Sequence, residues 1–254
     1  MKLLIDADYI VYKCCAAAED EIDWGDDVIM VTSKFTDAMK AVEREITKIV
    51  KEFFEPEVIL FFSSSNNFRK KISPDYKGHR NRKKPCGYKR VITELGKRYR
   101  TVLIDDLEAD DALGIYATKH PDCVIVSPDK DLKQIPGTLY DFNQIYNITP
   151  EEGWQWFLVQ ALSGDCTDGY SGAPGFGIRT SRNIFDEEGY TWETLVKAYK
   201  SKGLTEEDAL LNKRLARILQ KDDYDFRKKQ PIPWTPPVAK KRTNTRTRVQ
   251  AKGN

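Results

Sequence analysis

The sequence predicts an α/β fold in which a central, mostly parallel sheet is flanked by helices. Short buried strands alternate with helical segments in the first part of the chain. This alternation is typical of parallel sheets, because parallel strands are usually joined through a crossover helix. Acidic residues recur just after the predicted strands, and open α/β sheets form their sites at the carboxyl ends of strands.

Short apolar runs predict the strands. The runs cover residues 2–5, 58–62, 101–104 and 123–126, with a fifth strand expected at 138–142. Each run is too short for a typical helix and has the continuous apolar character of a strand buried on both faces. We therefore expect the sheet to form the centre of the core.

Helical spacing of apolar residues is clearest over residues 34–54, which predict an amphipathic helix. Further helices are expected over residues 109–118, 151–163 and 204–220. The predicted organisation is a core over residues 1–148 with a basic segment at about 66–90, a helical region over 149–230, and a disordered basic tail over 231–254.

Composition limits the class of protein. The chain has 254 residues, of which 40% are hydrophobic, so it can bury a core, and its net charge is only +2. Five cysteines without a CxxC pair and only two histidines argue against a zinc site and favour reduced thiols. No apolar run approaches the ~20 residues of a membrane span, and we expect no secretory signal. We therefore expect a cytoplasmic monomer with no membrane partner.

Three acidic clusters and the acid that ends the first strand are candidate metal ligands. Paired carboxylates are costly to bring together unless cations neutralise them, and Mg²⁺ prefers oxygen ligands. Two such ions can hold the attacking and leaving oxygens of phosphoryl transfer. The candidates are Asp6, Glu108, Asp110, Asp111, Asp129, Asp131, Asp165 and Asp168.

The spacing within these clusters favours convergence. Glu108 and Asp111, like Asp165 and Asp168, are three residues apart and would share a helical face. Asp129 and Asp131 would point the same way in an extended strand. Taken alone, the first cluster could instead cap a helix, the second could form a turn, and Asp165 and Asp168 could be solvated loop acids. The remaining nearby acids are expected to be supporting or surface residues: Asp8, Asp105 and Asp106.

A strongly basic segment follows the second predicted strand. Residues 69–90 contain ten Lys or Arg and one acid, which suits phosphate contacts, although a solvated basic loop is the alternative. Tyr76 and Tyr88 could stack on unpaired bases, while Lys77 and Arg80 could place positive charge on a scissile phosphate. The remaining candidate DNA contacts here are Arg69, Lys70, Arg82 and Lys83.

A glycine-rich stretch lies between the last two predicted helices. Gly172, Gly175 and Gly177 could turn backbone amides toward a phosphate, and a helix that begins near Arg179 and Thr180 would add its positive end. A plain turn between helices is the alternative. If the loop binds DNA, it should grip the backbone without reading sequence.

Five ordered motifs resemble the 5′→3′ exonucleases and flap endonucleases, particularly the small bacteriophage exonucleases. The motifs are LLIDADYIVY, FRKKISPDYKGHR, LEADDALG, SPDKDL and LSGDCTDGYSGAPGFGIRTS, within about residues 2–181. The resemblance implies a PIN-like fold and gives the eight acids above as metal ligands. It also places Tyr76, Lys77 and Arg80 in a basic arch above the active site. The glycine stretch would be a helix–turn–helix loop that holds duplex DNA and a potassium ion.

One position departs from the family pattern. Family members usually carry another Asp just after the second strand, where this chain has Ser63, Ser64 and Ser65. A hydroxyl could hold a water there, but a charged ligand is missing from that strand.

The resulting hypothesis is a 5′→3′ exodeoxyribonuclease that uses two Mg²⁺ or Mn²⁺ ions. A hydroxide would attack the phosphorus in line, with Lys77 and Arg80 stabilising the charge on the phosphate. The family resemblance adds flap cleavage, removal of RNA from RNA–DNA hybrids, and a role in phage replication or recombination in an infected host. Two alternatives remain, a non-catalytic binder of duplex or branched DNA and an RNA-cleaving PIN-type nuclease.

Overall fold

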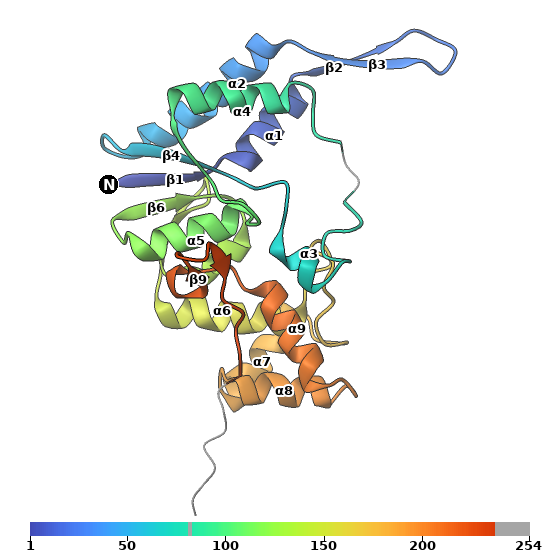
Figure 1. Ribbon diagram of the computed structural model, residues 1–254, viewed down its shortest axis with the longest axis vertical. Coiled ribbons are helices and arrows are strands. Elements are labelled where there is room, and N and C mark those ends of the chain that lie inside the picture. The colour runs from blue at the N-terminus through green and yellow to red at the C-terminus, as the bar shows by residue number, and fades with distance from the viewer. Residues whose placement is uncertain (81–82, 237–254) are drawn as a thin grey trace, which may run out of the picture.

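The computed structural model describes residues 1–80 and 83–236 and is built on one six-stranded sheet (Figure 1). The strand order is β5-β4-β1-β6-β7-β8. All neighbouring strands are parallel except β8, which is antiparallel to β7. The strands are β1 (Lys2–Asp6), β4 (Glu57–Phe62), β5 (Arg100–Leu103), β6 (Cys123–Val126), β7 (Gly137–Tyr140) and β8 (Ile145–Ile148). The predicted mostly parallel α/β fold is confirmed.

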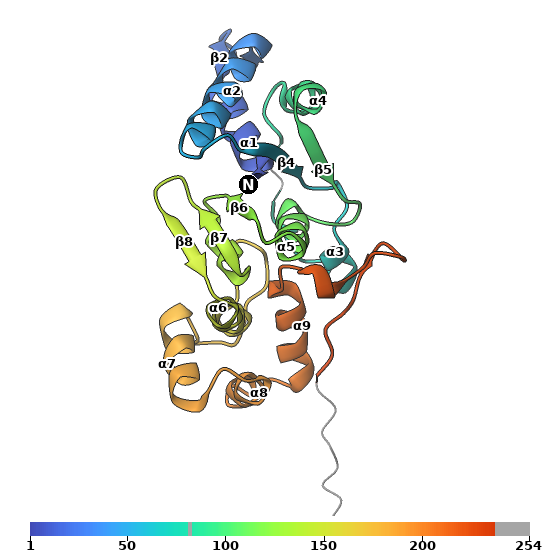
Figure 2. The ribbon, with the colours of Figure 1, turned by 90° about the vertical axis from the view of Figure 1, so that its left-hand side faces the viewer.

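Alternating side chains bury both faces of the sheet. Leu3 and Ile5 of β1 face a core built with α1 (Ala7–Ala17), α2 (Phe35–Lys51) and α4 (Tyr88–Arg98). Leu4 points to the opposite face, where α5 (Ala109–Lys119) packs (Figure 2). Because successive residues of a strand point to opposite faces, continuous apolar runs are what a doubly covered sheet requires.

A separate apolar cluster holds the helices of the C-terminal half together. Two of these helices begin with capping boxes, Thr149 with Glu152 and Thr205 with Asp208, which satisfy their first backbone amides. The helices are α6 (Pro150–Ser163), α7 (Ile178–Glu188), α8 (Trp192–Lys200) and α9 (Glu206–Ala216). Shorter elements are η1 (Lys130–Gln134), η2 (Lys221–Asp223), β9 (Tyr224–Asp225) and β10 (Gln230–Pro231).

Several elements were not predicted. The helices α1, α4 and α8 and the five-residue α3 (Phe68–Ile72) lie where no helix was expected. A hairpin of β2 (Glu19–Asp23) and β3 (Ile29–Ser33) projects from the body of the protein (Figure 1). Its strands pair only with each other, so no buried face imposed the alternation by which a strand is recognised.

Some expectations lie outside the described residues, namely the DNA contact of Arg82 and the part of the basic tail beyond residue 236. The division between core and helical region at residues 148 and 149 stays a prediction. Within the described ranges, no helix is long and apolar enough to cross a membrane.

Candidate active site

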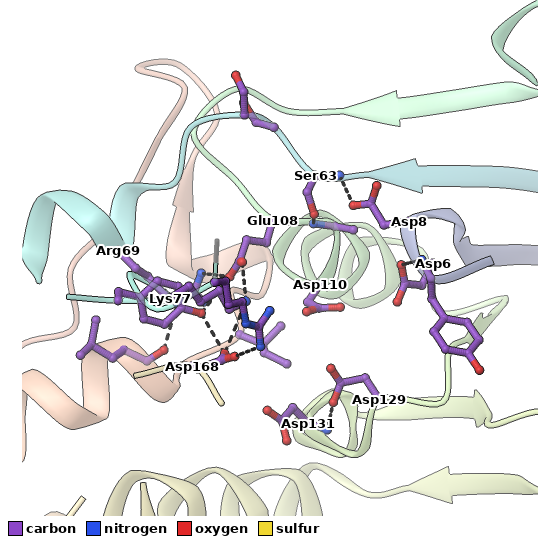
Figure 3. Close-up of a pocket in the computed structure, with 18 of the residues that line it drawn as sticks. Asp6, Asp8, Ser63, Arg69, Lys77, Glu108, Asp110, Asp129, Asp131 and Asp168 are labelled. Atoms are coloured by element: carbon purple, nitrogen blue, oxygen red, sulfur yellow. Dashed lines mark hydrogen bonds and ion pairs between the residues drawn. The ribbon is translucent and has the colours of Figure 1, made fainter. Parts of the chain in front are cut away.

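A cavity of about 530 Å³ opens at the carboxyl ends of the central strands (Figure 3). Its walls come from the ends of β1, β4 and β6, the start of α5, and the segments around residues 77 and 168. The charged and hydroxyl side chains that line it include Asp6, Asp8, Ser63, Ser64, Lys77, Arg80, Glu108, Asp110, Asp129, Asp131 and Asp168.

Local structure fixes the acids that follow the strands. Asp6 ends β1, begins α1 as its N-cap, and accepts a hydrogen bond of 3.0 Å from Ser127 Oγ. Asp129 is the N-cap of η1 and accepts a hydrogen bond of 2.8 Å from the amide of Asp131. The expected extended geometry of Asp129 and Asp131 is therefore wrong, since a 3₁₀ turn begins there, yet both side chains line the cavity.

Five of the acids form no salt bridge with any Lys or Arg in residues 1–80 and 83–236: Asp6, Asp8, Asp110, Asp129 and Asp131. Burial, together with Asp8, raises the pKa of Asp6 to about 7. Burial and the neighbouring Asp129 raise the pKa of Asp131 to about 7 and that of Asp110 well above its ordinary range. Crowded carboxylates of this kind ionise together only if cations offset their repulsion.

The donor set fits a hard divalent cation. Asp131 Oδ1 is buried and has no hydrogen-bond partner among the described residues, so it presents a free oxygen. Within those residues, no three acidic, His or Cys side chains converge on a single point. Mg²⁺ commonly binds through one or two carboxylates and keeps several waters. The spread of these acids around a cavity therefore suits a hydrated ion.

The other two acids of the cavity are already neutralised by the basic segment. Lys77 Nζ lies 2.5 Å from Glu108 Oε1, and Arg80 Nη2 lies 2.8 Å from Asp168 Oδ1. The single hydroxyl hydrogen of Tyr76 is shared between the two acids, with Oη 2.9 Å from Glu108 Oε2 and 3.0 Å from Asp168 Oδ2. Burial opposes ionisation of Glu108, but Lys77 and Arg69 outweigh it and lower the pKa of Glu108 to about 2.

Two expected site residues instead form a buried ion pair. Arg69, which is 3% exposed, makes two hydrogen bonds of 2.7 and 2.8 Å to the carboxylate of Asp111. Arg69 also donates to the backbone oxygens of Leu215 and Arg217, and Asp111 accepts from the amide of Leu219. The expectation of a DNA contact for Arg69 and of metal ligation for Asp111 is wrong, because this pair ties α5 and the start of the basic segment to the chain after α9.

The two tyrosines of the basic segment are also buried. Tyr76 is 2% exposed and Tyr88 is 6% exposed, so neither ring is free to stack on a base as we expected. Lys70 and Lys83 are exposed, as phosphate contacts must be. Part of the basic segment is thus packed into the protein, which the sequence did not predict because the segment contains few apolar residues.

The glycine-rich stretch divides into a buried and an exposed part. The amide of Gly172 donates to Asn212 Oδ1 at 3.0 Å, so the expected phosphate contact at Gly172 is wrong. Gly175, Gly177, Arg179 and Thr180 are exposed, and α7 begins immediately after Gly177. This leaves the N-terminal end of α7 open to solvent, where a helix favours anions.

Two residues of the site were not among the predicted site residues, and a further predicted metal ligand lies outside the cavity. Asp8 lines the cavity although we expected a supporting or surface role. Ser127 links two of the acidic residues, since its hydroxyl donates a hydrogen bond to Asp6 and accepts one from the amide of Asp129. The serine in the SPDKDL motif was the available signal. Asp165 does not line the cavity, and its Oδ1 accepts from the amide of Thr167.

Comparison with known proteins agrees with this geometry. Residues 1–154 match the family model of the 5′-3′ exonuclease N-terminal resolvase-like domain. The chain is 30% identical to the exodeoxyribonuclease of Enterobacteria phage T3, over 92% of each chain. It is also 30% identical to the exonuclease of Escherichia phage T7, over 92% of this chain and 93% of that one.

The fold also matches a solved structure, the T5 5′-exonuclease with bound zinc. The TM-score is 0.65 at 17% identity, and the match covers 85% of this chain and 88% of the T5 chain. The family model spans more than half of this chain, and the phage relatives align along nearly all of it. This protein therefore belongs to the 5′→3′ exonuclease family.

Proposed function

We propose that this protein is a divalent-metal-dependent 5′→3′ exonuclease that hydrolyses phosphodiester bonds of duplex DNA. The observation that carries the proposal is that acidic and basic side chains line one and the same cavity. The acidic side chains come from β1, α5 and η1, and the basic side chains come from the segment of residues 66–90. Among proteins of this fold, the T5 5′-exonuclease binds zinc, and the T5 flap endonuclease has been solved with DNA and metal ions.

The proposed metal ligands are four of the acids that lack a basic partner, Asp6, Asp110, Asp129 and Asp131, with Glu108 and Asp168 on the side of the basic segment. Mg²⁺ is the proposed ion and Mn²⁺ its substitute, because every donor is an oxygen. Two such ions would supply a nucleophile near neutral pH and stabilise the leaving oxygen.

Lys77 and Arg80 are proposed to bind the scissile phosphate. Both now contact carboxylates, Lys77 with Glu108 and Arg80 with Asp168. A phosphate that enters the cavity would compete with those carboxylates for the two cations. Charge that develops on the phosphate oxygens would then lie beside preplaced donors, which lowers the barrier.

The exposed part of the glycine stretch and the start of α7 are proposed to hold the backbone of the duplex. Gly175 and Gly177 expose backbone beside the N-terminal end of α7, and Arg179 adds a positive side chain. We also propose that this loop binds a potassium ion. The proposed substrates include flaps and RNA–DNA hybrids, and the proposed state of the protein is a monomer.

Product mapping tests the reaction. Duplex, flap and RNA–DNA hybrid substrates labelled at the 5′ or the 3′ end are incubated with Mg²⁺, with Mn²⁺, or with chelator. We expect release of short 5′-terminal products only when a divalent ion is present. Asp129→Asn should abolish most hydrolysis while duplex binding persists. Turnover at the wild-type rate in Asp129→Asn, or equal cleavage in chelator, would refute the metal-dependent mechanism.

A further inference from the structure

The end of β4 contributes no acid of its own to the cavity. The residues that follow β4 are Ser63, Ser64 and Ser65, and all three line the cavity wall. The ends of β1 and β6 and the start of α5, by contrast, each contribute a carboxylate that lacks a basic partner. A cation near β4 would therefore meet hydroxyl groups on this side unless another element supplied a charge.

Asp8 supplies a carboxylate at this place from the start of α1, which follows the neighbouring strand β1. It follows Asp6 by two residues, in the first turn of α1, and Figure 3 shows its side chain between Asp6 and Ser63. The amide of Ser63 donates to Asp8 Oδ2 at 2.8 Å, and Tyr88 Oη donates to Asp8 Oδ1 at 2.6 Å. These two donors hold the carboxylate over the end of β4.

The hydrogen bonds of Asp8 do not involve a basic side chain. Both donors are uncharged, and Asp8 forms no salt bridge with a Lys or Arg in the described part of the chain. Each carboxylate oxygen has a further lone pair after one hydrogen bond. A carboxylate held next to a second acid offers the oxygen ligands that a hard divalent cation prefers.

We propose that Asp8, together with Asp6, holds a divalent cation on the β4 side of the cavity. This inference rests on the proposed metal-dependent function and assigns Asp8 a role that replaces an acid at the end of β4. The competing interpretation is that Asp8 only anchors the start of α4 through Tyr88.

Binding of Mn²⁺ to the full-length protein without DNA tests the inference, with paramagnetic resonance or calorimetry as the readout. We expect Asp8→Asn to weaken one Mn²⁺ site by about tenfold or more, the size of loss seen when a metal site loses a supporting group. The matched control is Tyr88→Phe, which removes the anchoring hydrogen bond and keeps the charge. Because the amide of Ser63 still holds Asp8 in this variant, it should weaken the Mn²⁺ site far less than Asp8→Asn does.

A compensating variant separates charge from packing. Ser64→Asp adds a carboxylate at the end of β4, so in the Asp8→Asn background it should restore most of the lost Mn²⁺ affinity. If Asp8→Asn does not fold, Ser64→Lys offers a second route, because it places a positive charge there while leaving Asp8 intact. Ser64→Lys should weaken the same site by about tenfold.

The outcomes separate this inference from the proposed function. Wild-type Mn²⁺ binding in Asp8→Asn or Ser64→Lys overturns the role of Asp8, even if the wild-type protein cuts DNA. An equal loss of affinity in Tyr88→Phe and Asp8→Asn overturns it too, in favour of anchoring. A wild-type protein that neither binds Mn²⁺ nor cuts DNA instead overturns the proposed function.

Discussion

Replacing Lys213 by methionine should make this protein more stable. The Lys213 side chain is completely buried, and its Nζ has no hydrogen-bond partner among the described residues. Four aromatic rings surround it: Trp234 at 3.8 Å, Trp154 and Phe157 at 4.5 Å, and Trp192 at 6.0 Å from Nζ to the ring centre. Methionine has a similar length and fits an apolar, aromatic pocket.

The magnitude follows from the cost of burying the charge. Burial, and then the nearby Arg217, lower the pKa of Lys213 from its ordinary 10.5 to about 7. A difference of that size corresponds to about 5 kcal/mol against the charged form. Cation–π contacts with the rings return about 1–2 kcal/mol. We therefore expect Lys213→Met to raise the free energy of unfolding at pH 7 by about 3–4 kcal/mol.

The direction of the pH dependence of stability follows from the lowered pKa of Lys213. The pKa of Lys213 is lower in the folded than in the unfolded protein, so the unfolded chain binds more protons between about pH 7 and pH 10.5. The stability of the wild-type protein should therefore rise through this window, relative to Lys213→Met. The advantage of the variant should be largest near pH 7 and shrink toward pH 10.

Urea denaturation of both proteins at pH 7 and at pH 9.5, followed by tryptophan fluorescence and by circular dichroism, measures the difference. A variant less stable than the wild type at pH 7 would show that the rings stabilise the ammonium more than burial penalises it. A difference that does not change with pH would show that Lys213 does not titrate in this window.

Three further predictions concern the site and the glycine stretch. Lys77→Ala should slow cleavage by about 10²-fold or more and weaken duplex binding far less, in single-turnover assays; equal losses would mean that Lys77 only tethers DNA. The logarithm of the duplex binding constant should fall linearly with the logarithm of salt concentration through counterion release, and a flat response would rule out phosphate contacts. Gly172→Ala should cost about 1–3 kcal/mol, because the new Cβ would lie 2.4 Å from the amide nitrogen of Gly164. Gly177→Ala, which meets nothing within 4 Å, is its control and should cost less than about 1 kcal/mol; similar losses in calorimetric melting would refute the packing argument.

The sequence by itself determined five of the six strands of the sheet and the chemical character of the site, while β8 was not predicted. The buried strands are continuous apolar runs, as at Leu3–Ile5, and α2 repeats apolar residues at helical spacing, so local pattern was enough to find them. Acids after three of the predicted strands indicated a common site because parallel strands end at one edge. The helix α1 was missed because apolar residues occupy most of its surface and leave little periodic contrast.

Only the tertiary structure decided which of the charged residues face the cavity and which are held in ion pairs. Asp110 and Asp111 are adjacent in the sequence, yet Asp110 faces the cavity while Asp111 faces Arg69 and the chain after α9. Asp8 is held at the cavity by hydrogen bonds from Ser63 and Tyr88, which are distant in the sequence. Partners of this kind are chosen by packing between remote segments, and no local pattern of residue types contains that information.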